Sequence, residues 1–180
     1  MAHRDRDRSS RKRTRHEERQ ARLRTMTIEK FRRARALIAN AGGGDFEGPK
    51  PEALVAKGEE ALGVRFPPSY RQFLLELGCG NVSGFEVYGL VDDDFTNSSV
   101  PDAIWLTLEE RRTNGLDPRF IVIGALGDGT FDCLDTVHLD GSGEAPVVQV
   151  SAEGENPVRL ADSFGEYFLA EVQDALSDDA

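Results

Sequence analysis

The sequence predicts an α+β fold: a single, mostly antiparallel sheet with helices packed on one of its faces. Apolar residues recur at helical spacing through the first part of the chain and again at its end. Residues 119–160 instead hold short stretches rich in β-branched and aromatic residues, separated by glycine-containing turns. Runs of short strands joined by tight turns favour antiparallel pairing, and therefore α+β rather than a doubly wound α/β fold.

The first three helices are expected over residues 28–39, 52–62 and 68–77. The third has the clearest amphipathic pattern in the chain, formed at positions i, i+3, i+4 and i+7 by Tyr70, Phe73, Leu74 and Leu77. It opens at Pro67-Pro68, because a proline in the first turn lacks only an N–H that has no intrahelical partner there. Glycines follow the second and third helices and end them.

The remaining elements are a strand, a helix, four short strands and a final helix, over residues 84–91, 103–112, 119–123, 130–137, 147–151, 158–160 and 162–176. Ser99 to Asp102 resembles a capping box in front of the helix at 103–112. Gly127-Asp128-Gly129 predicts the turn of a hairpin between the first two of the four strands. No internal repeat is present, and we expect one core.

Charge is unevenly distributed along the 180 residues. Residues 1–40 contain 14 Lys/Arg and 5 Asp/Glu, a net charge of +9, whereas residues 41–180 contain 8 and 27, a net charge of −19. Residues 1–25 have no aromatic side chain and too few apolar ones to offset the entropy of ordering. We therefore expect a basic arm over 1–25, disordered or a frayed helix, and one domain over 26–180. Met26 is an alternative start, which would make the arm a gene-model artefact.

Composition argues against several classes of protein. No apolar stretch approaches the roughly 20 residues of a membrane-spanning helix, and the Arg- and Asp-rich N-terminus has no apolar segment typical of a secretory signal. Cys79 and Cys133 lie far apart and match no zinc-ligand spacing. Buried thiols in a reducing, cytoplasmic protein are expected.

Catalytic and metal-binding motifs are not found in the sequence. The three histidines form no pair at helical spacing, and neither a nucleophile elbow nor a phosphate-binding loop occurs. The aspartates at 92–94 and at 128, 132 and 135 do not match a calcium loop. We expect no enzyme activity, no metal and no cofactor, although a catalytic pair of carboxylates leaves no local signature and stays open.

The stretch from residue 62 to residue 74 resembles the signature of the SUKH superfamily. The matching residues are Glu59, Leu62, Gly63, Pro67, Tyr70, Phe73 and Leu74. Gly127, Asp128 and Gly129 resemble the strand–turn–strand of the same family, and the matches continue in order over about residues 28–176. Phe66 stands where leucine is usual, and the basic arm has no counterpart in the family pattern. The signature positions are expected to be structural.

The superfamily includes a fungal cell-wall assembly regulator and bacterial immunity proteins of polymorphic toxin systems. The resemblance therefore implies a non-catalytic protein-binding domain, in the first place an immunity protein that neutralises a cognate toxin. A regulatory scaffold that binds cellular proteins is the alternative. The acidic domain suits a basic partner, because opposite charge raises the association rate.

We expect the contact with the partner protein to involve exposed acidic residues: Asp92, Asp93, Asp94, Asp128 and Asp132. No membrane partner is expected, and nucleic acid is expected only through residues 1–25. The sequence leaves the oligomeric state open.

Overall fold

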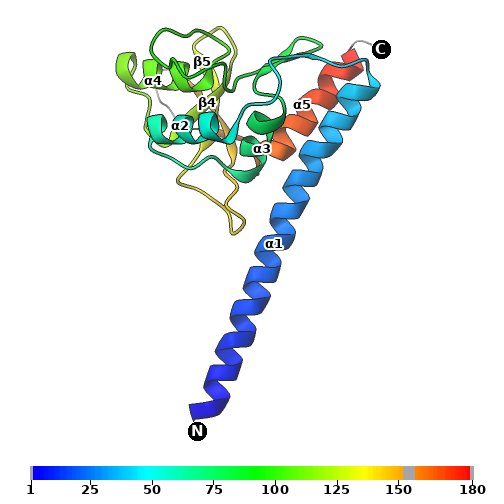
Figure 1. Cartoon of the computed structure of the whole chain (residues 1–180), viewed down its shortest axis with the longest axis vertical. Helices are drawn as coiled ribbons and strands as arrows, with labels where there is room; N and C mark the ends of the chain where they lie inside the picture. The colour runs from blue at the N-terminus through cyan, green and yellow to red at the C-terminus, as the bar shows by residue number, and fades with distance from the viewer. Residues whose placement is uncertain (1, 152–156, 179–180) are drawn as a thin grey trace.

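The computed structural model describes residues 2–151 and 157–178, and within these ranges it contains five helices and two antiparallel sheets (Figure 1). The helices are α1 (Ala2–Asn40), α2 (Glu52–Leu62), α3 (Pro68–Glu76), α4 (Ala103–Thr113) and α5 (Phe164–Asp178). The strands are β1 (Asp45–Phe46), β2 (Gly80–Val82), β3 (Phe85–Val87), β4 (Phe120–Ala125), β5 (Thr130–Asp135), β6 (Val147–Ser151) and β7 (Val158–Ala161). The predicted α+β class is confirmed.

The prediction of a single sheet needs correction. Strands β1, β2 and β3 form one sheet, and β4 to β7 form a second, each in chain order. The two sheets approach each other where Tyr88 N–H donates to the carbonyl of Ile123 at 2.8 Å. Gly80 shows how tightly β1 and β2 pair, since a Cβ there would lie 2.2 Å from the carbonyl oxygen of Asp45. The hairpin predicted at residues 127–129 joins β4 and β5, as expected.

Helices cover both faces of the four-stranded sheet, whereas the sequence predicted them on one. Side chains of β4 alternate between two apolar clusters. Val122 packs into the cluster that contains Leu106 of α4, and its N–H donates to Thr107 Oγ1 at 3.0 Å. Ile121 and Ile123 belong to the other cluster, which holds the buried side chains of α3 and α5. The sheet therefore lies between α4 on one side and α3 with α5 on the other.

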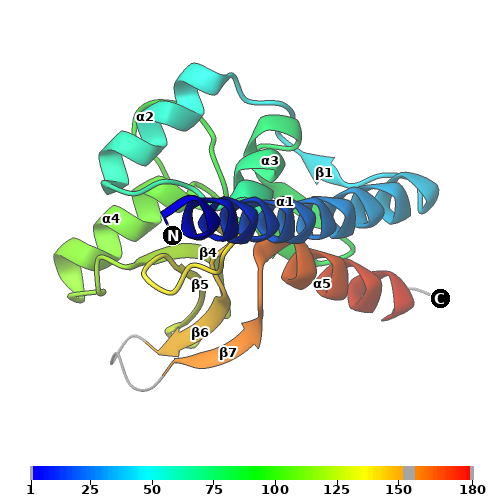
Figure 2. The ribbon, with the colours of Figure 1, turned by 90° about the horizontal axis from the view of Figure 1, so that it is seen from below.

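The first helix, α1, is much longer than its apolar pattern predicts. Its C-terminal half packs along α5, where Phe31 stacks on Phe168 with ring centroids 5.8 Å apart and Ala34 and Ile38 are buried. Its N-terminal half extends away from the rest of the molecule (Figures 1 and 2). The expected boundary between arm and domain falls inside this helix, and the division into two parts stays a prediction.

Candidate partner-binding site

The signature residues of the α2–α3 region lie in the core. Tyr70, Phe73 and Leu74 are fully buried, and Tyr70 donates its hydroxyl to the carbonyl of Tyr88 at 3.1 Å. Leu62 and Pro67 are also buried. These positions stabilise the fold and present nothing to a ligand.

The signature glycines serve the backbone. Gly63 ends α2 in the left-handed conformation, at φ +71°, and donates back into the last turn of that helix. Gly127 and Gly129 have φ of +84° and +87° on either side of Asp128, in the turn between β4 and β5. These are backbone conformations that residues with a Cβ adopt only with strain.

Two buried carboxylates fix the N-terminal end of α3 and the loop that leads to it. Glu59 accepts from Phe66 N–H at 2.9 Å and from Arg65 Nη1 at 3.1 Å, which holds the loop between α2 and α3. Glu144 accepts from both the N–H and the hydroxyl of Ser69, at 2.9 and 2.7 Å. Since Pro68 has no N–H, Ser69 offers the first free backbone donor of α3, and a carboxylate is favourable there.

Glu144 also joins α3 to α1, because it accepts from the Thr27 hydroxyl at 2.9 Å. Burial raises the pKa of Glu144, although the hydrogen bonds from Ser69 and Thr27 oppose that shift. The sequence analysis missed this residue, since one glutamate in a glycine-containing loop carries no local signal.

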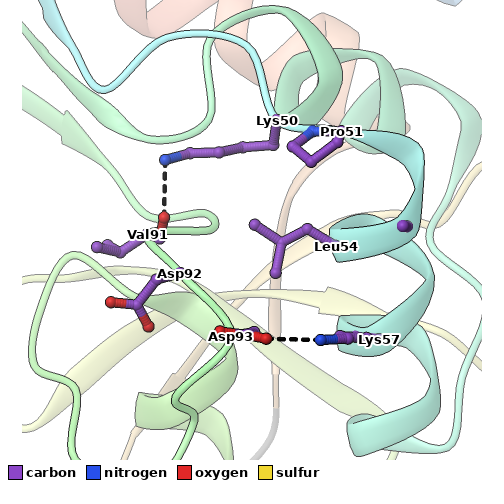
Figure 3. A pocket seen from close by; sticks show the side chains of 8 residues that line it. Lys50, Pro51, Leu54, Lys57, Val91, Asp92 and Asp93 are labelled. Carbon is purple, nitrogen blue, oxygen red and sulfur yellow. Dashed lines mark hydrogen bonds and ion pairs between the residues drawn. The ribbon is translucent and has the colours of Figure 1, made fainter.

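An open pocket lies on the surface between α2 and the segment that follows β3 (Figure 3). It has a volume of about 410 Å³ and is lined by Lys50, Pro51, Ala53, Leu54, Lys57, Val91, Asp92 and Asp93. Lys50 crosses one side of the pocket, with its Nζ donating to the carbonyl of Val91 at 2.8 Å. Lys57 and Asp93 form an ion pair at 2.6 Å on the other side. The pocket thus combines an apolar wall with charged groups at its edge.

Three of the predicted contact residues lie together beside this pocket. Asp92, Asp93 and Asp94 are exposed, on the loop that leaves the core after Leu90. Asp92 accepts from Asp94 N–H at 2.8 Å, and Asp94 in turn accepts from Thr96 N–H at 3.2 Å. These bonds order the loop, so that its carboxylates are presented in a fixed arrangement.

The electrostatics of this loop keep its carboxylates charged. The hydrogen bond from Lys57 lowers the pKa of Asp93, and hydrogen bonds from the side chain and backbone of Asn97 lower that of Asp94. Both groups are therefore ionised at neutral pH. Asp93, together with Asp92, lines the pocket that Leu54 also lines.

The other two predicted contact residues belong to the β4–β5 hairpin. Asp128 is exposed in the turn, where it accepts from Thr130 N–H at 2.9 Å, and hydrogen bonds from the side chain and backbone of Thr130 lower its pKa. Asp132 is half-buried and accepts from the Tyr167 hydroxyl at 2.7 Å and from Gln149 Nε2 at 3.4 Å. Both hydrogen bonds of the Asp132 carboxylate are therefore made within the protein, whereas the sequence predicted that Asp132 contacts a partner at the surface.

The two cysteines and His138 differ in their exposure. Cys79 and Cys133 are free and buried, as predicted, and burial raises the pKa of the Cys79 thiol to about 12. His138 is exposed and lies 2.8 Å from Asp135. In the ranges 2–151 and 157–178, no group of three or more His, Cys, Asp or Glu side chains is arranged to hold a metal ion.

Comparison with models of known protein families identifies the family of this chain. The model described as SUKH_6, SMI1-KNR4 cell-wall, matches residues 52–168, nearly two thirds of the sequence, from the start of α2 into α5. The matched region holds the core signature, all five predicted contact aspartates and every residue that lines the pocket except Lys50 and Pro51, and it leaves out α1. Among the residues that the structure describes, no helix is long and apolar enough to cross a bilayer. The protein therefore belongs to the SUKH superfamily, in its SMI1-KNR4 branch.

Proposed function

We propose that this protein is a non-catalytic immunity protein that binds and neutralises a cognate polymorphic toxin in the cytoplasm. Membership of the SUKH superfamily supports a protein-binding role. The observation that carries the proposal is the exposed loop at 92–94, of which Asp92 and Asp93 line a pocket with an apolar wall. Such a pocket can take one side chain of a partner while the surrounding acids meet basic residues, which is the arrangement of a central anchor and a charged rim.

The charge of the domain supports the same proposal. Residues 41–180 carry a net charge of −19, and a basic toxin domain, such as one that acts on nucleic acid, has the opposite sign. Opposite net charge raises the rate of encounter, and the exposed aspartates then add local complementarity. Asp93 is already paired with Lys57, so a basic partner residue displaces Lys57 or shares the carboxylate with it.

A regulatory scaffold is the second candidate, because the matching family model is described by a cell-wall role. The two proposals predict different partners for the same surface. The first needs a toxin domain encoded next to this gene, and the second needs an endogenous partner without toxicity.

The test is co-expression with the C-terminal domain of the large protein encoded beside this gene, followed by measurement of association kinetics. We expect the intact chain to protect the cell and to bind, and D92N/D93N to associate at least tenfold more slowly at low salt. The matched control is D45N/D174N, which removes two exposed carboxylates of β1 and α5 and is expected to change the rate less than twofold. Equal rates for the two variants would exclude the 92–94 loop, and absence of any complex would exclude the toxin.

A further inference from the structure

The N-terminal half of α1 carries an arginine stripe, defined here as Arg4, Arg8, Arg11, Arg15, Arg19 and Arg22. Their spacings of four and three residues average the helical repeat, so the six positions share one face over about five turns. In the part of the stripe whose side chains the structure describes, Arg15, Arg19 and Arg22 are all exposed. The stripe is outside the region that the family model matches.

The three arginines of the stripe whose side chains the structure describes lie on the side of α1 that faces away from the body of the protein. The body-facing side of α1 is marked by Gln20, which packs over Gly141, by Thr27, which is bonded to Glu144, and by the buried Phe31. At 100° per residue, Arg15, Arg19 and Arg22 lie on average about 150° around the helix from Phe31. Arg15, Arg19 and Arg22 are therefore not needed for packing and are exposed to solvent.

The type of residue indicates phosphate as the ligand. Of the ten basic residues in 1–25, nine are arginine, whose planar fork matches a phosphate in two-point hydrogen bonds. A membrane surface is a poor occupant, because an interfacial helix needs an apolar face and residues 2–25 offer only Ala2, Ala21 and Leu23.

The acidic body of the protein would repel phosphate, but α1 is long enough to hold the stripe away from it. Residues 26–180 carry a net charge of −16, whereas residues 1–25 carry +6. From Gln20 to the start of α1 the helix spans about 27 Å, at 1.5 Å per residue. Charges on the body are screened over about 8 Å at physiological ionic strength. A polyanion bound along the stripe therefore meets mainly the arm's positive field.

We infer that the projecting half of α1 binds double-stranded DNA through its phosphates. A straight, continuous basic helix fits the major groove, which admits one α-helix and is bordered by phosphates. The stripe supplies contacts to the backbone, and these position a protein without reading sequence. The inference does not depend on the toxin partner, since it uses a different surface.

The test measures binding of the full chain to a mixed-sequence 20-base-pair duplex by fluorescence anisotropy between 50 and 300 mM salt. Six neutralised phosphates predict a slope of log K against log salt of about −5. R15Q/R19Q/R22Q is expected to bind at least tenfold more weakly, with a slope reduced by about 3. The matched variant R6Q/R13Q/R24Q loses the same charge from positions off the stripe and is expected to lose clearly less affinity. Circular dichroism confirms that each variant is folded.

A third variant works in the opposite direction. Glu18 is exposed and lies three and four residues from Arg15 and Arg22, so E18Q is expected to bind the duplex two- to threefold more tightly. Three results would overturn the inference. They are weaker duplex binding by E18Q, an equal loss of affinity in the two arginine triple variants, and equal affinity of the protein for polyglutamate and for the duplex. A different result would assign the arm to binding a second copy of the chain instead of DNA. In that case the protein does not bind the duplex, and sedimentation shows a salt-sensitive dimer that R15Q/R19Q/R22Q abolishes.

Discussion

Buried and exposed carboxylates of this protein make similar hydrogen bonds but do different things. Glu144 binds donors on Ser69 and Thr27, which are remote in sequence and belong to different helices. Asp92 and Asp128 each bind the backbone N–H of the residue two positions ahead, and so organise only their own turn. Glu144 therefore ties separate elements of the fold together, whereas Asp92 and Asp128 order only their own turns and stay exposed.

The largest effect is expected from Glu144→Ala. This change leaves the N–H and hydroxyl of Ser69 without their acceptor in a buried place, and it removes the hydrogen bond from Thr27 of α1. We expect the free energy of unfolding, measured by urea denaturation, to fall by about 3 kcal/mol. E144Q keeps one carbonyl oxygen and is expected to lose less. A loss below about 1 kcal/mol in E144A would remove the distinction between the two classes of carboxylate.

Asp102→Ala is expected to have the next largest effect. Asp102 is fully buried at the N-terminus of α4, where it accepts from Ile104 N–H at 2.9 Å and Trp105 N–H at 2.8 Å. It also accepts from Val91 N–H at 3.3 Å. Loss of this cap is expected to cost about 2 kcal/mol by the same measurement, and D102N, which retains an acceptor, is the control. Equal losses in the two variants would contradict a capping role.

The pH dependence of stability sharpens the comparison. Burial raises the pKa of Glu144 above its usual 4.5, so between these two values the folded state binds more protons than the unfolded state. The stabilisation from this group is complete below pH 4.5 and is lost as pH rises through the folded pKa. We therefore expect the stability of the wild type minus that of E144Q to fall as pH is raised from 4.5, then to level off. Urea denaturation from pH 4 to 8 measures it, and a difference that grows with pH would contradict the assignment.

The smallest effect on stability is expected from the exposed carboxylates. D92N and D128N each retain an oxygen that accepts the local N–H, and both residues are exposed. We expect each to change the free energy of unfolding by less than about 0.5 kcal/mol. If either variant instead loses as much stability as D102A, its loop is part of the structural framework and not a surface available for binding.

The sequence predicts helices and strands well where proline or glycine at their ends agrees with the periodicity of apolar residues between them. Helix α2 has the predicted bounds because Pro51 precedes it and Gly63 follows it. Strand β6 has the predicted bounds because it is rich in β-branched valine. Strands β1 and β2 were missed, since two or three residues cannot show an alternating pattern. They pair because the chain brings Phe46 beside Gly80, which is a tertiary event. The three-stranded sheet was missed as a separate sheet for the same reason.

The candidate site is only partly readable from the sequence. The aspartates at 92–94 were predicted from their run of charge, and the structure adds the pocket formed with Leu54 and Lys57. Asp132 shows the limit, because its partner Tyr167 lies 35 residues away on α5. A residue's burial depends on such remote neighbours, and composition does not report them.

The pairing of the C-terminal half of α1 with α5 joins segments that are far apart in the sequence, and this affects how the protein is made. Phe31 meets its stacking partner Phe168 only after more than a hundred further residues have been synthesised. At typical ribosome speeds this is a delay on the order of 10 s. During that time Phe31 and Ile38 lack the surface on which they pack, so a chaperone that shields the nascent N-terminal helix has a defined interval in which to act.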